Sequence, residues 1–134
     1  MRQYLLDTDV SIDYLRGSVE VSHRITAAGL ANFRLSEITV AELKYGAAKS
    51  NRPEHNRLQV EAFIGDFGIM PIYESLDTFA SEKARLEKLG LRLDDFDLLI
   101  GATAIHYGLI LVTNNVKHFE RMKGLHIENW ATFY

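Results

Sequence analysis

The sequence predicts an α/β fold of three layers, in which helices cover both faces of a central parallel sheet of four to five strands. Short apolar runs that suit buried strands alternate along the chain with longer segments of helical periodicity. A connection that contains a helix returns the chain to the same end of the sheet, so strands joined in this way run parallel. Polar residues directly follow several of the apolar runs, and they would meet at the carboxyl edge of the sheet, where such folds bind ligands.

The composition fits one domain that spans residues 1–134, because 47% apolar residues can fill a sizeable core. A formal net charge of -3 excludes a uniformly basic nucleic-acid binder, although a local basic patch remains compatible with it. The sequence contains no cysteine, which excludes disulfides and cysteine-ligated zinc. No apolar run approaches the roughly 20 residues of a membrane-spanning helix, and no signal-like segment precedes the first strand. We therefore expect a soluble cytoplasmic protein without a membrane association.

The first strand, residues 4–6, ends abruptly at Asp7. Asp7 has two interpretations, which the stretch alone leaves equally open: it is the N-cap of the next helix, or it is a metal ligand at the sheet edge. Two short helices are expected next, residues 10–16 and 19–28, and a glycine ends each of them.

The second strand is expected at residues 33–38 and the following helix at residues 39–49. Thr39 and Glu42 have the spacing of a capping box, in which the two side chains cap each other's backbone in the first turn. The capping box is a structural role for Glu42. Its position after a strand also makes Glu42 a candidate ligand at the same edge as Asp7.

A further helix begins at Pro53, a residue that suits the first helical turn. It carries an apolar stripe at helical spacing, formed by Val60, Phe63, Ile64 and Phe67. The stripe is either part of the monomer's own core or an exposed patch that marks a partner, such as a second copy of the chain. The sequence leaves both possibilities open.

The third strand is expected at residues 69–73, and Ser75 is the expected cap of a long helix that reaches about residue 89. The segment 94–105 is apolar nearly all round after an acidic start, which is typical of a largely buried helix. Its first turn contains Asp97. One face of this helix is formed by small residues and Asp97, and we expect it to approach the sheet closely: Asp97, Gly101, Ala104 and Gly108.

The fourth strand is expected at residues 109–112, with Asn115 just beyond its carboxyl end, and a short fifth strand at residues 125–128. Four polar side chains would then share one edge of the sheet: Asp7, Glu42, Asp97 and Asn115. Three carboxylates placed close together repel one another, and a hard divalent cation such as Mg²⁺, or Mn²⁺ in its place, relieves the repulsion in an all-oxygen site. The five histidines lack a metal-binding spacing, and we expect them to be surface or core residues.

Read together and in order, five segments resemble the PIN-domain family, and within it the VapC-like toxins of bacterial toxin–antitoxin pairs. Each segment is weakly specific by itself, and the order makes the resemblance specific. The segments cover nearly the whole chain: residues 6–9, 38–47, 97–100, 111–115 and 128–130.

The resemblance implies a metal-dependent endoribonuclease, inhibited by a VapB-like antitoxin and assembled as a homodimer. The acidic quartet of the family maps onto Asp7, Glu42 and Asp97 as metal ligands, with Asn115 as the fourth catalytic position, where many relatives have aspartate. Asp94 adds a charge near the metal where relatives often have glycine. Small polar side chains would position the metal ligands by hydrogen bonds: Thr8, Ser36 and Thr113. Cationic side chains would attract the phosphate groups: Lys44, Lys49, Arg85 and Lys117.

Two alternatives come from other functional classes. The run Asp7-Thr8-Asp9-Val10-Ser11 also fits the first motif of haloacid-dehalogenase-like phosphatases, in which the first acid is a nucleophile. That fold usually needs a longer chain, and its lysine has no clear place here. The other alternative is a catalytically inactive PIN fold that serves as a binding module, which the three intact acids argue against.

Overall fold

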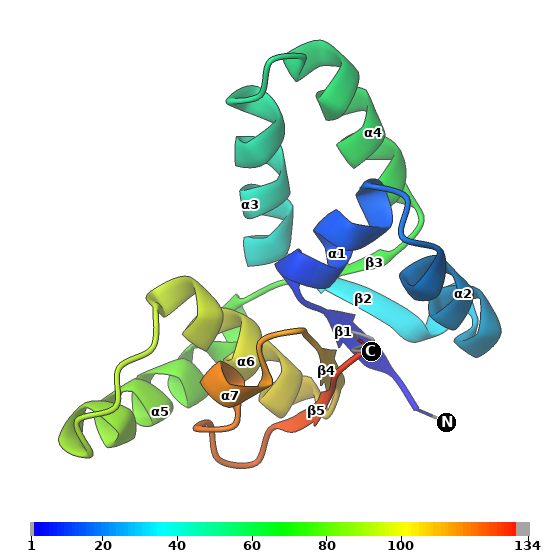
Figure 1. The fold of residues 1–134 in the computed structure, drawn as a ribbon. Helices are drawn as coiled ribbons and strands as arrows, with labels where there is room; N and C mark the ends of the chain where they lie inside the picture. Colours follow the sequence, from blue (N-terminus) through cyan, green and yellow to red (C-terminus); the bar gives the residue numbers. More distant parts are fainter. Residues whose placement is uncertain (1, 131–134) are drawn as a thin grey trace.

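Five short strands form a single parallel sheet in the order β3-β2-β1-β4-β5 (Figure 1). The structure is a computed structural model that describes residues 2–130, so residues 1 and 131–134 of the expected domain lie outside the described part. The strands of each neighbouring pair run parallel. The expected parallel sheet is therefore confirmed, with the strands β1 (Tyr4–Leu6), β2 (Phe33–Ser36), β3 (Gly68–Met70), β4 (Ile110–Val112) and β5 (His126–Glu128).

Two hydrophobic cores lie on opposite faces of the sheet, as the three-layer prediction requires. Along β1, Tyr4 and Leu6 belong to one core and Leu5 to the other, because successive side chains of a strand point to opposite faces. Figure 1 shows the early helices above the sheet and the late helices below it. The helices are α1 (Thr8–Leu15), α2 (Val19–Ala28), η1 (Leu30–Asn32), α3 (Glu37–Ala48), α4 (Pro53–Gly65), η2 (Tyr73–Ser75), α5 (Leu76–Lys88), α6 (Asp95–Tyr107) and α7 (Val116–Phe119).

The start of α3 differs from the sequence prediction. Strand β2 ends at Ser36, and Ser36 is the N-cap, because its buried hydroxyl accepts a hydrogen bond from the backbone N–H of Ile38 at 3.1 Å. The expected capping box of Thr39 and Glu42 is therefore wrong. Both residues lie too far into the helix to cap it, and their side chains instead interact with the hydroxyl of Thr8. The sequence favours Thr39 as the cap because Thr39 has the capping-box spacing to Glu42. In the structure the strand ends earlier, at the buried Ser36, so Ser36 occupies the capping position.

We expect Ser36→Ala to lower the free energy of unfolding by roughly 1 kcal/mol, the usual cost of losing a serine cap. Thr39→Ala leaves this cap in place, so it is expected to affect the acidic site more than the helix. Chemical denaturation of both variants, with an RNA-cleavage assay alongside, checks the ranking. A larger loss of stability in Thr39→Ala than in Ser36→Ala would restore the capping box.

Strand β3 is shorter than expected, because Pro71 follows Met70 directly and has no N–H to donate to a β-ladder. The chain turns there, and the N–H of Ile72 donates instead to Glu37 Oε1 at 2.9 Å. Ser75 occupies the expected N-cap position of α5, but its side chain does not cap the helix. Its hydroxyl makes no capping bond, and it is buried without a hydrogen-bond partner among residues 2–130.

The apolar stripe on α4 belongs to the monomer's own core. Val60, Phe63 and Phe67 are buried, and Ile64 is partly buried against the same core. The rings of Phe63 and Phe67 lie 5.0 Å apart, and Tyr14 of α1 packs against Phe63 at 5.2 Å. The stripe therefore supplies no argument for a homodimer.

The expected helix face around Gly101 is used differently from the prediction. A Cβ atom at Gly101 would collide with the sulfur of Met122 and lie 3.6 Å from the ring of Phe119. Gly101 therefore allows α6 to approach α7 and the turn after it, rather than the sheet. This contact fixes α7 beside the first turns of α6, where Asp97 is located.

Candidate metal-binding site

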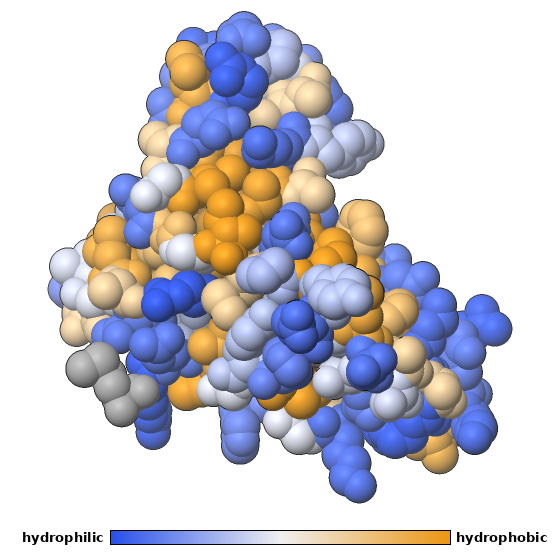
Figure 2. Space-filling view, turned by 180° about the vertical axis from the view of Figure 1, so that it is seen from behind, coloured by the Kyte–Doolittle hydropathy of each residue, from blue (hydrophilic) through white to orange (hydrophobic). Residues whose placement is uncertain are grey.

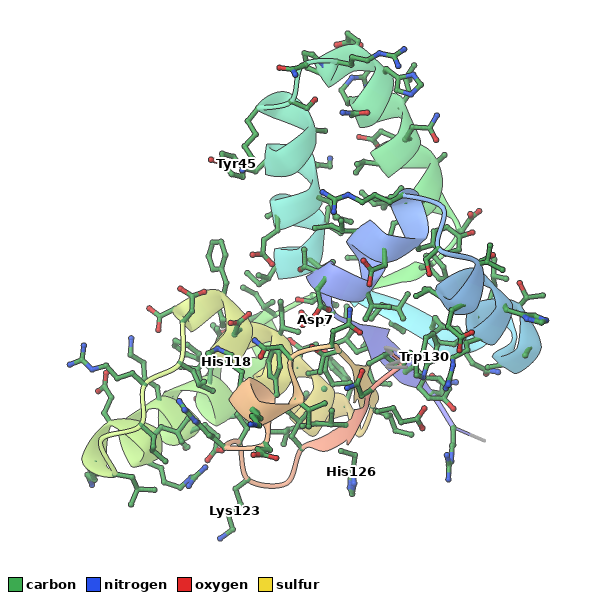
Figure 3. The ribbon with its side chains drawn as sticks, viewed as in Figure 1. Asp7, Tyr45, His118, Lys123, His126 and Trp130 are labelled. Carbon is green, nitrogen blue, oxygen red and sulfur yellow. The ribbon has the colours of Figure 1, made fainter. Side chains whose placement is uncertain are left out.

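Asp7 lies where β1 passes into α1, and the structure confirms the N-cap, one of the two interpretations that the sequence left open. Its Oδ1 caps α1 by accepting a hydrogen bond from the N–H of Thr8 at 2.8 Å. Its Oδ2 accepts a hydrogen bond from the hydroxyl of Thr113, which follows β4, also at 2.8 Å. The side chain is only 5% exposed. Asp7 is thus a cap and also a buried acid at the carboxyl edge of the sheet (Figure 3).

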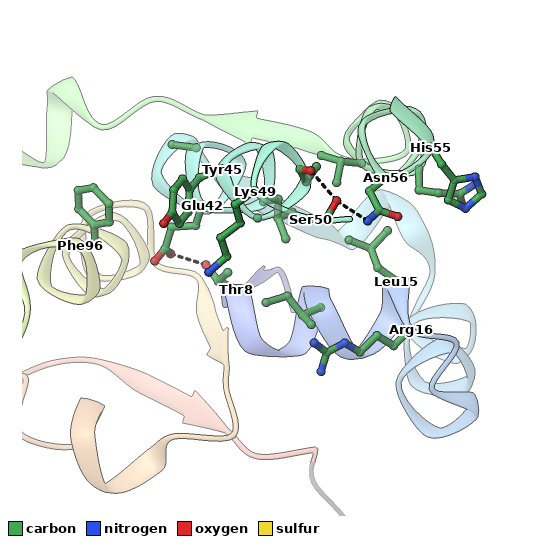
Figure 4. A pocket seen from close by; sticks show the side chains of 17 residues that line it. Thr8, Leu15, Arg16, Glu42, Tyr45, Lys49, Ser50, His55, Asn56 and Phe96 are labelled. Atoms are coloured by element: carbon green, nitrogen blue, oxygen red, sulfur yellow. Dashed lines mark hydrogen bonds between the residues drawn. The ribbon is translucent and has the colours of Figure 1, made fainter. Parts of the chain in front are cut away.

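Glu42 lies in the second turn of α3 and faces the start of α1. The hydroxyl of Thr8 donates to Glu42 Oε1 at 2.6 Å and lies 3.1 Å from the hydroxyl of Thr39 (Figure 4). Thr8 therefore orients Glu42, and Thr39 supports Thr8. The expectation that Thr8 and Thr113 position acidic side chains is confirmed, whereas Ser36 caps α3 instead.

Asp97 reaches the same region from the other side of the sheet, in the first turn of α6. Asp94 is the N-cap of this helix and accepts a hydrogen bond from the N–H of Phe96 at 3.1 Å. The Oδ2 of Asp97 lies 2.9 Å from Nε2 of His118, a residue of α7. Since both side chains are only about a quarter exposed, the contact is partly shielded from water.

Asn115 joins this group through its backbone. Its N–H donates to the Thr113 hydroxyl at 3.0 Å, and the same hydroxyl donates to Asp7. Its side chain is exposed and makes no capping bond to α7. Within residues 2–130, the backbone of Asn115 is thus linked to Asp7 through the Thr113 hydroxyl, whereas its side-chain amide makes no hydrogen bond to the acids.

The acids share an electrostatic environment. Burial, together with the charge of Asp9, raises the pKa of Asp7 to about 7, although the hydrogen bond from Thr113 opposes this shift. Burial also raises the pKa of Glu42 and of Asp97. Asp97 repels both Asp7 and Glu42, although three separate segments of the chain carry these side chains. Asp94 repels Glu42 and Asp97, as expected for an extra charge near the site.

The donor chemistry of these residues fits a hard divalent cation, because carboxylate oxygens are the ligands that Mg²⁺ prefers. The hydrogen bonds within residues 2–130 engage Oε1 of Glu42 and Oδ2 of Asp97, which leaves the second oxygen of each carboxylate for another partner. In the same part of the chain, no three acidic or imidazole side chains already stand close enough to hold an ion directly. A cation would therefore be held partly through water, as Mg²⁺ usually is.

Sequence reasoning missed two contributors to this site. Asp9 accepts hydrogen bonds from the N–H of Val10 at 2.7 Å and of Asn114 at 3.0 Å, and it thereby clamps the loop after β4 onto α1. For His118 the sequence predicts only a surface or core position, because it has no histidine partner at metal-binding spacing. Its position three residues after Asn115, at the same sheet edge, was the signal that could have identified it.

A groove of about 1080 Å³ runs from the site between α1, α3 and α4. Thr8 and Glu42 lie at one end, where Tyr45 and Phe96 flank the Glu42 carboxylate (Figure 4). The groove has a largely apolar lining that includes Ile12, Leu15, Leu43 and Val60, and its cationic residues are Arg16 and Lys49.

The four cations expected to attract phosphate have different roles in the structure. Arg85 binds Glu82 through two hydrogen bonds of 2.8 and 2.9 Å and donates to the carbonyl of Arg121, so it is a structural link. Lys44 lies 3.5 Å from Glu61. Lys49 lies over the ring of Tyr45 at 5.0 Å and lines the groove, and Lys117 is exposed on α7.

Comparison with known proteins identifies the family of this chain. The family model of the PIN domain matches residues 4–125. The chain belongs to the PIN domain family. It is 39% identical to ribonuclease VapC2 of Haemophilus influenzae over 98% of this chain and 100% of the relative. It is 31% identical to the tRNA(fMet)-specific endonuclease VapC of Shigella flexneri, with the same coverage of both chains.

Solved PIN-domain structures share the fold. A chain in the crystal structure of DNA-bound VapBC from Salmonella typhimurium superimposes with a TM-score of 0.92 at 32% identity, over 98% of this chain and 100% of that chain. The resemblance to VapC-like PIN domains is thus confirmed. The family assignment removes the haloacid-dehalogenase-like phosphatase from consideration. Among residues 2–130, none of the helices combines the length and apolar character needed to cross a bilayer.

Proposed function

We propose that this PIN-domain protein is a VapC-type endoribonuclease, the toxin of a toxin–antitoxin pair, and that it cleaves RNA phosphodiester bonds with Mg²⁺ held by Asp7, Glu42 and Asp97. The observation that carries the proposal is the convergence of three acids, from β1, α3 and α6, at one sheet edge, where Asp97 repels the other two. Relatives at 31–39% identity are named as ribonucleases or endonucleases. The three acids also argue against an inactive binding module.

The residues have separable roles in the proposed reaction. Mg²⁺, when bound, would lower the pKa of a water and neutralise charge on the phosphate oxygens. Asp7 would supply its carboxylate from a buried position held by Thr113, and Glu42 would be oriented by Thr8. Asn115 would interact with water or substrate from the exposed end of the same hydrogen-bonded chain. Lys49 and Lys117 would attract the RNA backbone near the edge.

The proposal predicts that the purified protein, free of any partner, cleaves RNA in Mg²⁺ or Mn²⁺ and stops when the metal is chelated. Sequencing the RNA ends after a brief pulse of expression, in cells without the antitoxin, would identify the bond that is cut. Cleavage that persists at full rate in excess chelator would contradict the metal-dependent mechanism. Hydrolysis of phosphate monoesters in place of RNA would contradict the ribonuclease itself.

A VapB-like antitoxin is the proposed inhibitor, and the groove beside Glu42 fits a segment of such a partner. An amphipathic helix could lay its apolar face on the lining that includes Ile12, Leu15 and Val60. Acidic residues on the segment would face Arg16 and Lys49. A basic side chain at its end would reach Glu42 and Asp97 and replace the positive charge of the metal. Inhibition would then result from direct competition for the acidic edge.

A homodimer is also proposed, and its interface must lie elsewhere than on the α4 stripe. Exposed apolar residues remain around the edge strand β3 and η2, where Ile69 and Leu76 flank Tyr73, which is 76% exposed. Figure 2 shows hydrophobic side chains gathered in the middle of the side of the molecule that is opposite to the view of Figure 1. A face of this kind on a small domain suits a second copy of the chain.

Tyr73→Glu is expected to shift the protein from dimer to monomer, as measured by light scattering across a range of concentrations. Val19→Glu is the matched control, because Val19 is 80% exposed on α2, outside this face. Each protein is then titrated with the product of the neighbouring gene. A wild type that stays monomeric at high concentration would refute the dimer, and full RNA cleavage in the presence of that product would refute the antitoxin.

A further inference from the structure

His118 is held in a fixed position beside Asp97 by the short helix α7. Phe119, the next residue, is buried, and α7 packs against α6 at Gly101. The backbone N–H of His118 donates to the carbonyl of Asn115 at 3.2 Å. Its ring meets the ring of Phe119 edge to face at 5.8 Å. These contacts place Nε2 at 2.9 Å from Asp97 Oδ2, in a direction set by the packing of two helices.

Asp97 gains from such a partner because acidic side chains around it repel its charge. Asp94 repels it, and it in turn repels Asp7 and Glu42. An aspartate that is about a quarter exposed would gain by turning further toward water, away from the other two acids. A hydrogen bond from the His118 ring N–H to Oδ2 of Asp97 opposes this rotation. The other oxygen, Oδ1, takes no part in this hydrogen bond.

We infer that His118 is a positioning residue, which holds the Asp97 carboxylate in the orientation that binds the cation. The inference rests on the proposed metal-dependent function and deepens it. The acidic sites of metalloproteins commonly depend on hydrogen bonds of this kind, and their removal typically weakens metal binding or activity by roughly 10- to 100-fold. In this chain, α7 therefore contributes to the site through His118 as well as through the backbone of Asn115.

The decisive experiment measures Mn²⁺ binding by electron paramagnetic resonance, with the full chain and the metal alone at one fixed pH. His118→Phe keeps a ring of similar size and removes the donor, and His118→Ala removes the ring as well. We expect either change to weaken Mn²⁺ binding roughly 10- to 100-fold. His118→Gln has an amide donor of similar reach and should restore binding to within a few fold of the wild type.

Two further measurements separate positioning from a general structural role. His126→Ala is the matched control, because His126 is exposed on β5 and points away from the acidic edge (Figure 3), so its Mn²⁺ affinity should be unchanged. In RNA cleavage, the Mn²⁺ concentration for half-maximal rate should rise in His118→Phe by the same factor as the dissociation constant. The rate at saturating Mn²⁺ should change much less.

Three results would overturn the inference and leave the metal site in place. One is unchanged Mn²⁺ affinity in a folded His118→Phe protein, and another is a His118→Gln protein that binds as weakly as His118→Phe. The third is a nitrogen coupling in the Mn²⁺ spectrum of the wild type, since this would make His118 a direct ligand. A wild type that binds no Mn²⁺ overturns the metal site and this inference together. A wild type that binds Mn²⁺ with the expected ranking but cleaves no RNA removes the proposed function alone.

Discussion

Replacing Asp7 by asparagine is expected to abolish RNA cleavage and, without metal, to stabilise the folded protein above neutral pH. Burial raises the pKa of Asp7 to about 7, from an ordinary value of 3.8. The folded state therefore binds this proton more tightly than the unfolded state. The stability that the neutral carboxyl contributes is complete below pH 3.8 and is lost as the pH rises through 7. At pH 8 the loss is on the order of 4 kcal/mol, which Asp7→Asn removes.

The measurement is the thermal midpoint of wild type and Asp7→Asn at pH 5 and pH 8 in chelator. The variant should gain most at pH 8. Adding Mg²⁺ at pH 8 should raise the midpoint of the wild type more than that of the variant, because the cation compensates the buried charge. Asp97→Asn is the companion variant: it should also abolish cleavage, with a smaller change in stability because Asp97 is partly exposed.

The outcome distinguishes catalytic acids from structural ones. If Asp7→Asn and Asp97→Asn both fail to fold, the acids are needed for the structure, and the metal site loses its main support. If both fold and still cleave RNA at the wild-type rate, the nuclease site lies elsewhere. Loss of cleavage in two folded variants is the expected result.

Replacing Val60 by glutamate is expected to unfold most of the protein, because Val60 is 6% exposed within the core beneath α4. An unpaired carboxylate there loses its hydration and gains no partner, which usually costs more than about 4 kcal/mol. Leu58 of the same helix is 58% exposed. Leu58→Glu is therefore the matched control, with an expected change within about 0.5 kcal/mol.

Urea denaturation followed by circular dichroism measures both changes. A Val60→Glu protein that is monomeric, folded and as stable as the wild type would mean that α4 presents this side chain to a partner rather than to the core. In that case the apolar stripe would again be a candidate dimer interface. The result thus separates the two roles that the sequence left open for Val60, Phe63 and Phe67.

The sequence by itself predicted the parallel sheet and its functional edge. The alternation of strand-like runs with helical segments determines that successive strands run in the same direction. Asp7 directly follows β1, and Asp97 lies in the first turn of an apolar helix, so both positions can be read from local pattern. The boundaries were less certain where two polar residues competed for one role. At the end of β2, Ser36 rather than Thr39 became the cap.

Only the tertiary structure decided which side chains meet. Thr8 bonds Glu42 across 34 positions in the chain, and Thr113 bonds Asp7 across 106. His118 reaches Asp97 because Gly101 lets α6 approach Met122 and Phe119, a contact with no local signature in the sequence. The stripe on α4 likewise turned inward because Tyr14 and Phe33 supply aromatic partners from other elements. Periodicity fixes which residues of a helix share a face, whereas the packing of distant segments determines what that face touches.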